Sequence, residues 1–134
     1  MKYLLDTNIC IYLIKQKPQQ VLKRFERETI GDIGISTITV SELYYGVEKS
    51  QQRERNRGAL EQFLLPLMIM EFDYKATLVY GKLRAELERE GKPIGPLDTL
   101  IASHALSLNT TLVTNNENEF GRVKGLNVEN WVAN

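Results

Sequence analysis

The sequence has only one cysteine, Cys10, among its 134 residues. A single cysteine excludes an intrachain disulfide and any CxxC metal site. Cys10 lies in an apolar helical stretch, and we expect it to pack in the core. The sequence also lacks an apolar run that resembles a membrane span, and its N-terminus lacks the pattern of a signal peptide. We therefore expect a cytoplasmic protein that has no membrane partner.

An excess of one charge is also lacking, because 17 Lys and Arg residues balance 17 Asp and Glu residues. The chain therefore has no overall basic footprint for nucleic acid, although a local basic patch can coexist with a cluster of acids. Basic residues gather in two segments, which contain Lys15, Lys17, Lys23 and Arg24, and Arg53, Arg55 and Arg57. We interpret both groups as solvated helix faces.

Short apolar segments alternate with helical patterns along the whole chain. We expect strands in the ranges 2–5, 33–35, 67–72, 110–114 and 126–131, with helices between them. This alternation predicts an α/β fold in which a parallel sheet is covered by helices on both faces. The length suits one domain with one core, and the sequence shows no repeat and no convincing domain boundary.

A few residues are predicted to mark where helices begin and end. Pro18 fits the first position of the second helix, where its missing N–H costs nothing. Asp73 can cap a later helix, and Gly91 can terminate it. The polar segment 48–57 is expected to be an exposed turn or helix end, and "KPIGPLD" at 92–98 is the one connection rich in Pro and Gly.

Polar side chains follow the predicted strands or begin the next helices. Asp6 follows the first strand, Glu42 lies early in the helix after the second, Asp98 begins the helix after "KPIGP", and Asn116 and Glu119 follow "TTLVT". Because the carboxyl ends of parallel strands meet at one edge of a sheet, we expect these residues to converge on one cleft. A divalent cation such as Mg²⁺ or Mn²⁺ would offset the repulsion between the carboxylates. Such a metal site is suited to phosphodiester hydrolysis.

Each acid also has a simpler structural interpretation. Asp6 and Asp98 could act only as helix caps, and Glu42 could be a solvated helical residue. Taken together, these interpretations explain poorly why every acid falls at the same expected edge of the sheet.

Four segments together resemble the PIN-domain ribonucleases, and more narrowly the VapC toxins of bacterial toxin–antitoxin pairs. They are "LLDTN" at 4–8, "SELYYGVEKS" at 41–50, "PIGPLDTLIASHALSLN" at 93–109 and "LVTNNENEF" at 112–120. The resemblance covers essentially the whole chain. It implies a single PIN domain over residues 1–134, with a Rossmann-like central parallel β-sheet flanked by α-helices.

The resemblance implies a toxic endoribonuclease that depends on Mg²⁺ or Mn²⁺. Asp6, Glu42 and Asp98 occupy the family's three main acidic positions, and are expected to be both catalytic residues and metal ligands. Asn116 occupies the fourth position, where many PIN domains carry Asp. An amide there can orient water or a ligand but adds no charge, so a second metal ion is in doubt. Glu119 could approach the site or cap the following turn.

Two hydroxyl groups, those of Thr7 and Thr114, are expected to support the carboxylates. The resemblance also implies partners: an RNA substrate, with tRNA as its class, and a VapB-like antitoxin whose C-terminal segment wraps the toxin. That segment commonly inserts a basic residue into the acidic cleft. Operator DNA would be bound only through the antitoxin. A homodimer within a toxin–antitoxin hetero-oligomer is expected.

Histidine occurs once, at His104, six residues beyond Asp98. Metal ligation or acid–base chemistry is conceivable for it, but we expect a packing or hydrogen-bonding role. Tyr44 and Tyr45 could stack on a base, although helix packing is the simpler expectation. Trp131 is expected to close the core.

Two alternatives compete with a ribonuclease. Another α/β phosphoryl hydrolase that forms an aspartyl intermediate would carry a second Asp where this chain has Asn8, and a receiver domain would need a lysine near the last strand, where Thr114 and Asn115 stand. The other alternative is a PIN-fold binding module without catalysis. The three carboxylates argue against it, since an inactive domain has no need for their repulsion.

Overall fold

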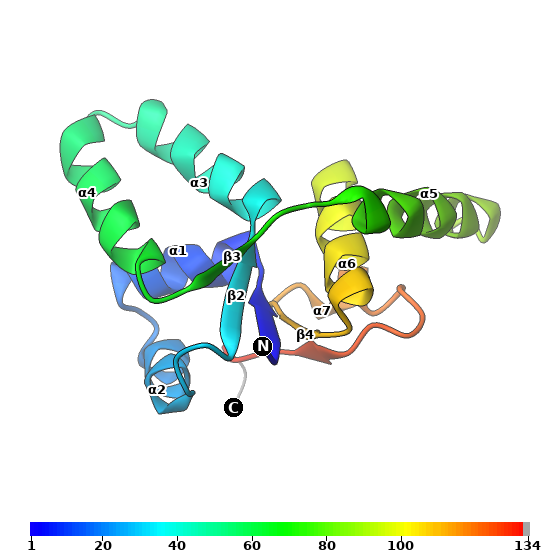
Figure 1. Ribbon diagram of the computed structural model, residues 1–134, viewed down its shortest axis with the longest axis horizontal. Helices are drawn as coiled ribbons and strands as arrows, with labels where there is room; N and C mark the ends of the chain where they lie inside the picture. Colours follow the sequence, from blue (N-terminus) through cyan, green and yellow to red (C-terminus); the bar gives the residue numbers. More distant parts are fainter. Residues whose placement is uncertain (133–134) are drawn as a thin grey trace.

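A five-stranded parallel sheet forms the centre of the protein, in the order β3-β2-β1-β4-β5 (Figure 1). The structure is a computed structural model, and it describes residues 1–132. The strands are β1 (Tyr3–Leu5), β2 (Ile33–Ser36), β3 (Met68–Met70), β4 (Thr111–Val113) and β5 (Val128–Glu129). All four pairings are parallel, so the predicted sheet is confirmed, with strands shorter than expected. The strand order reverses beside β1, which makes the crevice between the ends of β1 and β4 the topological switch point.

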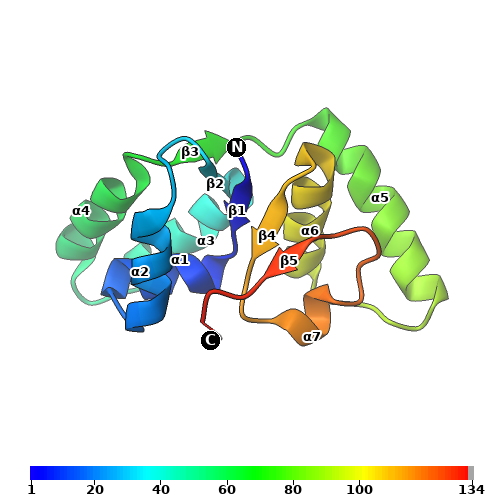
Figure 2. The same ribbon diagram turned by 90° about the horizontal axis from the view of Figure 1, so that it is seen from below.

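Helices cover both faces of this sheet, as Figure 2 shows. One face carries α1 (Thr7–Lys15), α2 (Gln19–Arg27), α3 (Thr37–Glu48) and α4 (Arg53–Leu64). The other carries α5 (Tyr74–Arg89), α6 (Pro96–Leu108) and the short α7 (Glu117–Phe120). Within residues 1–132, no helix is long and apolar enough to cross a membrane.

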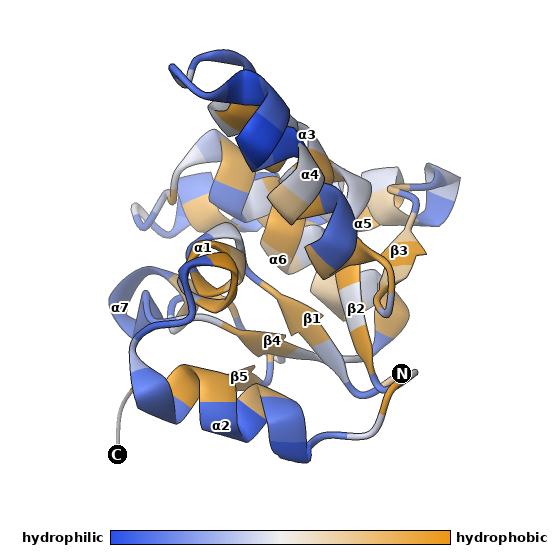
Figure 3. Cartoon of the chain, turned by 90° about the vertical axis from the view of Figure 1, so that its left-hand side faces the viewer, coloured by the Kyte–Doolittle hydropathy of each residue, from blue (hydrophilic) through white to orange (hydrophobic). Residues whose placement is uncertain are grey.

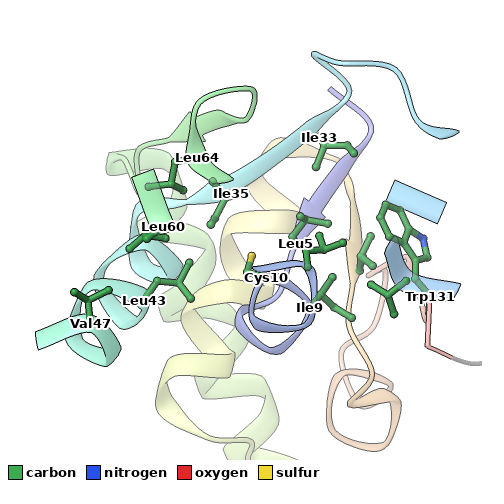
Figure 4. Close-up of a cluster of buried hydrophobic side chains, with 13 residues drawn as sticks. Leu5, Ile9, Cys10, Ile33, Ile35, Leu43, Val47, Leu60, Leu64 and Trp131 are labelled. Atoms are coloured by element: carbon green, nitrogen blue, oxygen red, sulfur yellow. The ribbon is translucent and has the colours of Figure 1, made fainter. Parts of the chain in front are cut away.

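Alternation along the strands divides the core into two clusters, because successive side chains of a strand point to opposite faces. Leu5 and Val113 pack against the layer of α1 to α4, whereas Leu4 and Leu112 pack against α5 and α6. Figure 4 shows the first cluster, in which Cys10 is fully buried between the sheet and the helices. The expectation that Cys10 is a core residue is therefore confirmed.

Aromatic packing closes the first cluster at the β5 end of the sheet. The rings of Trp131 and Tyr3 meet edge to face with centroids 5.3 Å apart, and Trp131 is buried, as expected. The Arg24 guanidinium lies 5.0 Å from the Trp131 ring centroid and pairs with Glu28 and Glu129. The prediction that Arg24 belongs to a solvated face is wrong, because its helix α2 turns this residue toward the aromatic pair.

Helix boundaries follow the sequence signals with one exception, Pro18. Asp73 caps α5 by accepting the Ala76 N–H at 3.0 Å, and Gly91, with φ of 69°, follows its end, as predicted. Pro18 is not the first helical residue: its ψ of 160° leaves it extended, as the N-cap of α2. The segment 48–57 holds both the end of α3 and the first residues of α4, and Figure 3 shows its polar character.

The two tyrosines of α3 differ. Tyr44 packs against the first cluster, as expected. Tyr45 is 61% exposed, with the Lys49 ammonium 4.9 Å from its ring centroid, so the prediction that it packs in the helix layer is wrong. The two residues differ because neighbouring positions point about 100° apart around a helix.

Two leucines of α5 test this division between core and surface. Leu83 is 6% exposed within the second cluster, whereas Leu78 on the same helix is 60% exposed. We predict that Leu83→Ala lowers the free energy of unfolding by about 2–5 kcal/mol, because it leaves a cavity. Leu78→Ala should change it by no more than about 0.5 kcal/mol. Urea denaturation measures both, and equal losses would contradict the assignment of α5 faces.

Candidate active site

Asp6 lies at the switch point, directly after β1, and its carboxylate is only 5% exposed. Oδ1 accepts the backbone N–H of Thr7 at 2.8 Å, which caps α1. Oδ2 accepts the hydroxyl of Thr114 at 2.7 Å, from the residue after β4. Burial raises the pKa of Asp6 above its ordinary value, although both hydrogen bonds oppose the rise. Asp6 is therefore a helix cap whose second oxygen is held across the crevice between β1 and β4.

Thr114 links Asp6 to the segment that follows β4. Its hydroxyl donates to Asp6 and also accepts the backbone N–H of Asn116 at 3.0 Å. Thr7 acts differently from Thr114, because only its backbone N–H contacts Asp6, while its hydroxyl lies 3.4 Å from that of Thr39. The hydroxyl of Thr114 supports Asp6, as expected, whereas the hydroxyl of Thr7 does not contact Asp6 and Thr7 contributes only its backbone N–H.

Asp98 and Glu119 form a pair of facing carboxyl groups. Asp98 lies in the first turn of α6, and Glu119 reaches it from α7. Burial, the hydrogen bond to Glu119 and the charges of Glu119 and Asp6 together raise the pKa of Asp98 to about 7, and burial contributes most. The raised pKa of Asp98 and the lowered pKa of Glu119 mean that, below about pH 7, a proton is held by Asp98 in preference to Glu119.

Glu119 is fixed by donors from two other segments. Its Oε1 accepts the backbone N–H of Gly95, and its Oε2 accepts the side-chain amide of Asn116 at 2.8 Å. Foremost the Gly95 N–H, and then the hydrogen bonds from Asp98 and Asn116, hold the pKa of Glu119 below its ordinary value. The sequence left Glu119 between two roles, and the structure places it in the acid site. Asn116 supplies a donor rather than a charge.

Gly95 is a contributor that sequence reasoning missed. A Cβ at this position would lie 3.4 Å from Glu119 Oε1 and 3.8 Å from Asp98 Oδ2. Any side chain would therefore occupy space beside both carboxyl groups. The signal in the sequence was the "PIGP" turn directly before Asp98, which marks a loop without revealing that its N–H binds an acid.

Glu42 stands apart from these three acids. It is half-buried on α3, where it lines a largely apolar groove between α1, α3 and α4. The other lining residues are Ile11, Ile14, Lys15, Leu43, Gly46, Val47, Asn56, Ala59 and Leu60. No hydrogen bond given for residues 1–132 joins Glu42 to Asp6, Asp98 or Glu119. Glu42 thus places a carboxylate on the wall of a largely apolar groove.

The donor set was tested for its fit to a metal ion. Within residues 1–132, no three side chains of His, Cys, Asp or Glu form a ready-made group that could hold a metal. Mg²⁺ does not require one, because it is commonly bound by one or two carboxylates while keeping several waters. The facing oxygens of Asp98 and Glu119 are hard ligands, and they already share one positive charge, the proton. The residues present therefore fit a divalent cation.

His104 takes no part in this set of oxygens. It is fully buried, its Nδ1 lies 2.8 Å from Ser36 Oγ, and its ring meets that of Phe72 edge to face at 5.3 Å. Burial lowers the pKa of His104, and the Asp73 carboxylate and Glu71 carbonyl oppose this only partly. A packed and hydrogen-bonded histidine agrees with the role that the sequence predicted.

One atom of that histidine is unsatisfied. Nε2 has no hydrogen-bond partner in the described part of the chain, so the Glu71 carbonyl acts on the ring without hydrogen-bond geometry. Leaving a buried polar group unpaired costs about 1–3 kcal/mol. The ring orientation is therefore set by the Ser36 contact and by Phe72, not by Nε2.

Known proteins resemble this chain over most of its length. The PIN domain family model matches residues 3–126. The tRNA(fMet)-specific endonuclease VapC of Shigella flexneri is 47% identical over 98% of both chains, and ribonuclease VapC2 of Haemophilus influenzae is 48% identical over 98% of this chain and 99% of its own.

Solved structures agree with these relatives. The DNA-bound VapBC complex of Salmonella typhimurium contains a chain that superposes with a TM-score of 0.93 at 44% identity, over 98% of both chains. In VapBC2 of Rickettsia felis, bound to a promoter DNA fragment, the TM-score is 0.89 at 47% identity, over 98% of this chain and 99% of that one. The switch-point aspartate, the acid pair of α6 and α7, and this full-length similarity agree, and the chain belongs to the PIN-domain family, within its VapC branch.

Proposed function

We propose that this chain is a toxic, divalent-metal-dependent endoribonuclease that cleaves tRNA and is neutralised by a VapB-like antitoxin. The observation that carries the proposal is the convergence of Asp6, Asp98 and Glu119 at the switch point, because the charge of Glu119 raises the pKa of both Asp6 and Asp98, and the charge of Asp6 also raises that of Asp98. A fold does not need such a cluster, whereas a cation site does. The tRNA class comes from the Shigella relative, which is named for cleaving an initiator tRNA.

Asp6, Asp98 and Glu119 would hold the cation, with Glu42 as a further acid that approaches from α3. When bound, a divalent cation polarises a phosphoryl oxygen and lowers the pKa of a water that attacks the phosphorus. The chain's own residues fix the acids: Thr114 orients Asp6, and Asn116 and Gly95 orient Glu119. The amide of Asn116 adds no charge, which favours one metal ion over two.

Neither alternative gains support from this site. A phosphoryl hydrolase of another family would not share nearly half of its residues with two ribonucleases. A binding module without catalysis would have no use for carboxyl groups whose burial shifts the pKa of Asp98 so far.

The groove between α1, α3 and α4, which Glu42 lines, is suited to bind a segment of the antitoxin. The walls of this groove are mainly apolar, and Glu42 adds a negative charge to them. An amphipathic helix can place its apolar face in such a groove and a Lys or Arg against the acid. The VapBC relatives were solved with DNA, and in this system DNA binding would belong to the antitoxin. The toxin is proposed to form a homodimer within that complex.

Asp6→Asn tests the catalytic assignment, with Asp73→Asn as its matched control. Both residues cap helices, and Asn caps about as well as Asp, but only Asp6 lies in the acid site. We predict that Asp6→Asn lowers tRNA cleavage by more than about 100-fold, since even outer-shell partners of a metal ligand are worth 10–100-fold. Expression of this variant should no longer arrest growth. Equal activity of the two folded variants would show that Asp6 is only a cap.

Asp98→Asn tests the cation site through thermal melts with chelator and with Mn²⁺. The folded-state pKa of Asp98, about 7, lies above its ordinary value of 3.8, so its proton stabilises the folded state and this stability is lost as pH rises through 7. In chelator, the variant should therefore melt higher than wild type at pH 8, and this advantage should shrink at pH 5. Mn²⁺ should raise the melting temperature of wild type much more than that of the variant.

A neighbouring carboxylate of α7 provides the control for that experiment. Glu117 accepts the Asn130 side-chain amide at 3.0 Å and takes no part in the acid pair. Glu117→Gln should therefore keep the full Mn²⁺ shift. Equal Mn²⁺ shifts in wild type, Glu117→Gln and Asp98→Asn would rule Asp98 out as a ligand.

Gly46→Trp tests the groove as the antitoxin site. A side chain at Gly46 meets nothing within 4 Å, so the fold can accept it, while its bulk would fill the groove. Gly81→Trp on α5, equally open but on the other face of the sheet, is the control. We expect Gly46→Trp, and not Gly81→Trp, to abolish co-purification of the antitoxin. Retention of the antitoxin by both variants would place its binding surface elsewhere.

A further inference from the structure

A buried hydrogen bond joins the two long elements that carry Glu42 and Asp98. His104 Nδ1 on α6 and Ser36 Oγ at the start of α3 are 2.8 Å apart, and both residues are fully buried. Phe72 packs its ring edge to face against His104 and donates its N–H to Thr37 Oγ1 at 3.2 Å. We call Ser36, Thr37, Phe72 and His104 the α3–α6 joint.

The direction of the central bond follows from the second contact of Ser36. Ser36 Oγ already accepts the backbone N–H of Ile38 at 3.0 Å, which caps α3. The hydroxyl has one proton, and His104 Nδ1 is the acceptor within reach. We assign Ser36 as the donor to a neutral imidazole whose Nδ1 carries no hydrogen, because this direction gives the hydroxyl proton an acceptor. One hydroxyl both begins α3 and fastens it to α6.

The joint stands at the same sequence distance from both acids. Glu42 comes six residues after Ser36 along α3, and Asp98 comes six residues before His104 along α6. Six helical residues make an arm of about 9 Å. In Figure 1, α3 begins close to α6 and then runs away from it, so the angle between the helices sets how far apart the acids are. A rotation of about 10° at the joint would move the end of a 9 Å arm by about 1.5 Å.

We propose that His104 is a positioning residue, which sets the separation of Glu42 from Asp98 by accepting the Ser36 hydroxyl. The inference rests on the proposed ribonuclease function, because it assigns a purpose to the distance between two of its acids. His104 touches neither substrate nor metal. A misplacement of about 1 Å in a catalytic group can cost 100-fold in rate, so a bond this far from the acids can matter to turnover.

The test compares tRNA cleavage by the full-length chain and its variants at saturating and limiting Mn²⁺. His104→Leu keeps bulk in the core and removes the acceptor. We expect its kcat to fall about 10–100-fold while KM for tRNA stays within about threefold, and the Mn²⁺ concentration for half-maximal rate to rise. His104→Asn places Oδ1 where Nδ1 was and should recover most of kcat. A residue that only fills space would show neither the kcat-specific loss nor this rescue.

Ser36→Ala removes the other half of the bond, and should reproduce the loss in kcat. The double variant Ser36→Ala, His104→Leu should have a kcat no lower than that of the poorer single variant, because both substitutions remove the bond between α3 and α6, and the α3 cap is already lost in Ser36→Ala alone. Ser103→Ala is the matched control: Ser103 is as buried and lies next to His104, but its hydroxyl bonds only within α6, to the Thr99 carbonyl at 2.6 Å. Its kcat should match wild type.

Three results would overturn the inference. The first is a wild-type kcat in folded His104→Leu or, if that variant does not fold, in Ser36→Ala. The second is an equal loss of kcat in Ser103→Ala. The third is unfolding of both His104→Leu and Ser36→Ala, which would show that the α3–α6 joint serves stability. The proposed function fails separately. Wild-type chain that does not cleave RNA would refute both, whereas active wild type with an active His104→Leu refutes the positioning role alone.

Discussion

Repulsion between carboxyl groups at the end of the sheet is the constraint on which the site depends. Burial raises the pKa of Asp6 and Asp98, and the charge of Glu119 raises both further. Neighbouring residues donate hydrogen bonds to two of these acids. Thr114 donates to Asp6, and Gly95 and Asn116 donate to Glu119. Only Asp98 lacks such a neutral donor among its described partners, and it is the acid that keeps a proton. That position is where a cation would replace the proton most directly.

Local patterns predicted the parts of the fold that depend on a few neighbouring residues. The strand before Asp6, the cap at Asp73 and the helix that begins near Asp98 follow from apolar periodicity and capping chemistry. Pro18 was misplaced by one position because its fixed φ suits an N-cap as well as a first helical residue. The convergence of the acids followed from topology, because all strands are parallel and their ends share one edge.

Contacts between segments that are distant in the sequence could not be predicted from local sequence patterns. Glu119 turns toward Asp98 because α7 is short and its side chain meets the Gly95 N–H, and no pattern in "NNENEF" shows this. Likewise, α3 runs away from α6 (Figure 1), and Glu42 lines a groove between α1, α3 and α4. The bond between Ser36 and His104 joins residues 68 positions apart, and each residue alone looks like ordinary core or capping chemistry.

The hydrogen bond from Thr114 to Asp6 closes a loop of 108 positions and joins the ends of β1 and β4. The ribosome synthesises Asp6 about 108 residues before Thr114, and Asn116 and Glu119 follow Thr114. A ribosome-bound chain that has made only α1 to α6 has neither the hydroxyl that orients Asp6 nor the partner of Asp98. A chain that stops before Thr114 therefore lacks the partners of both Asp6 and Asp98, and its acid site cannot be assembled during synthesis until β4 and α7 have been made.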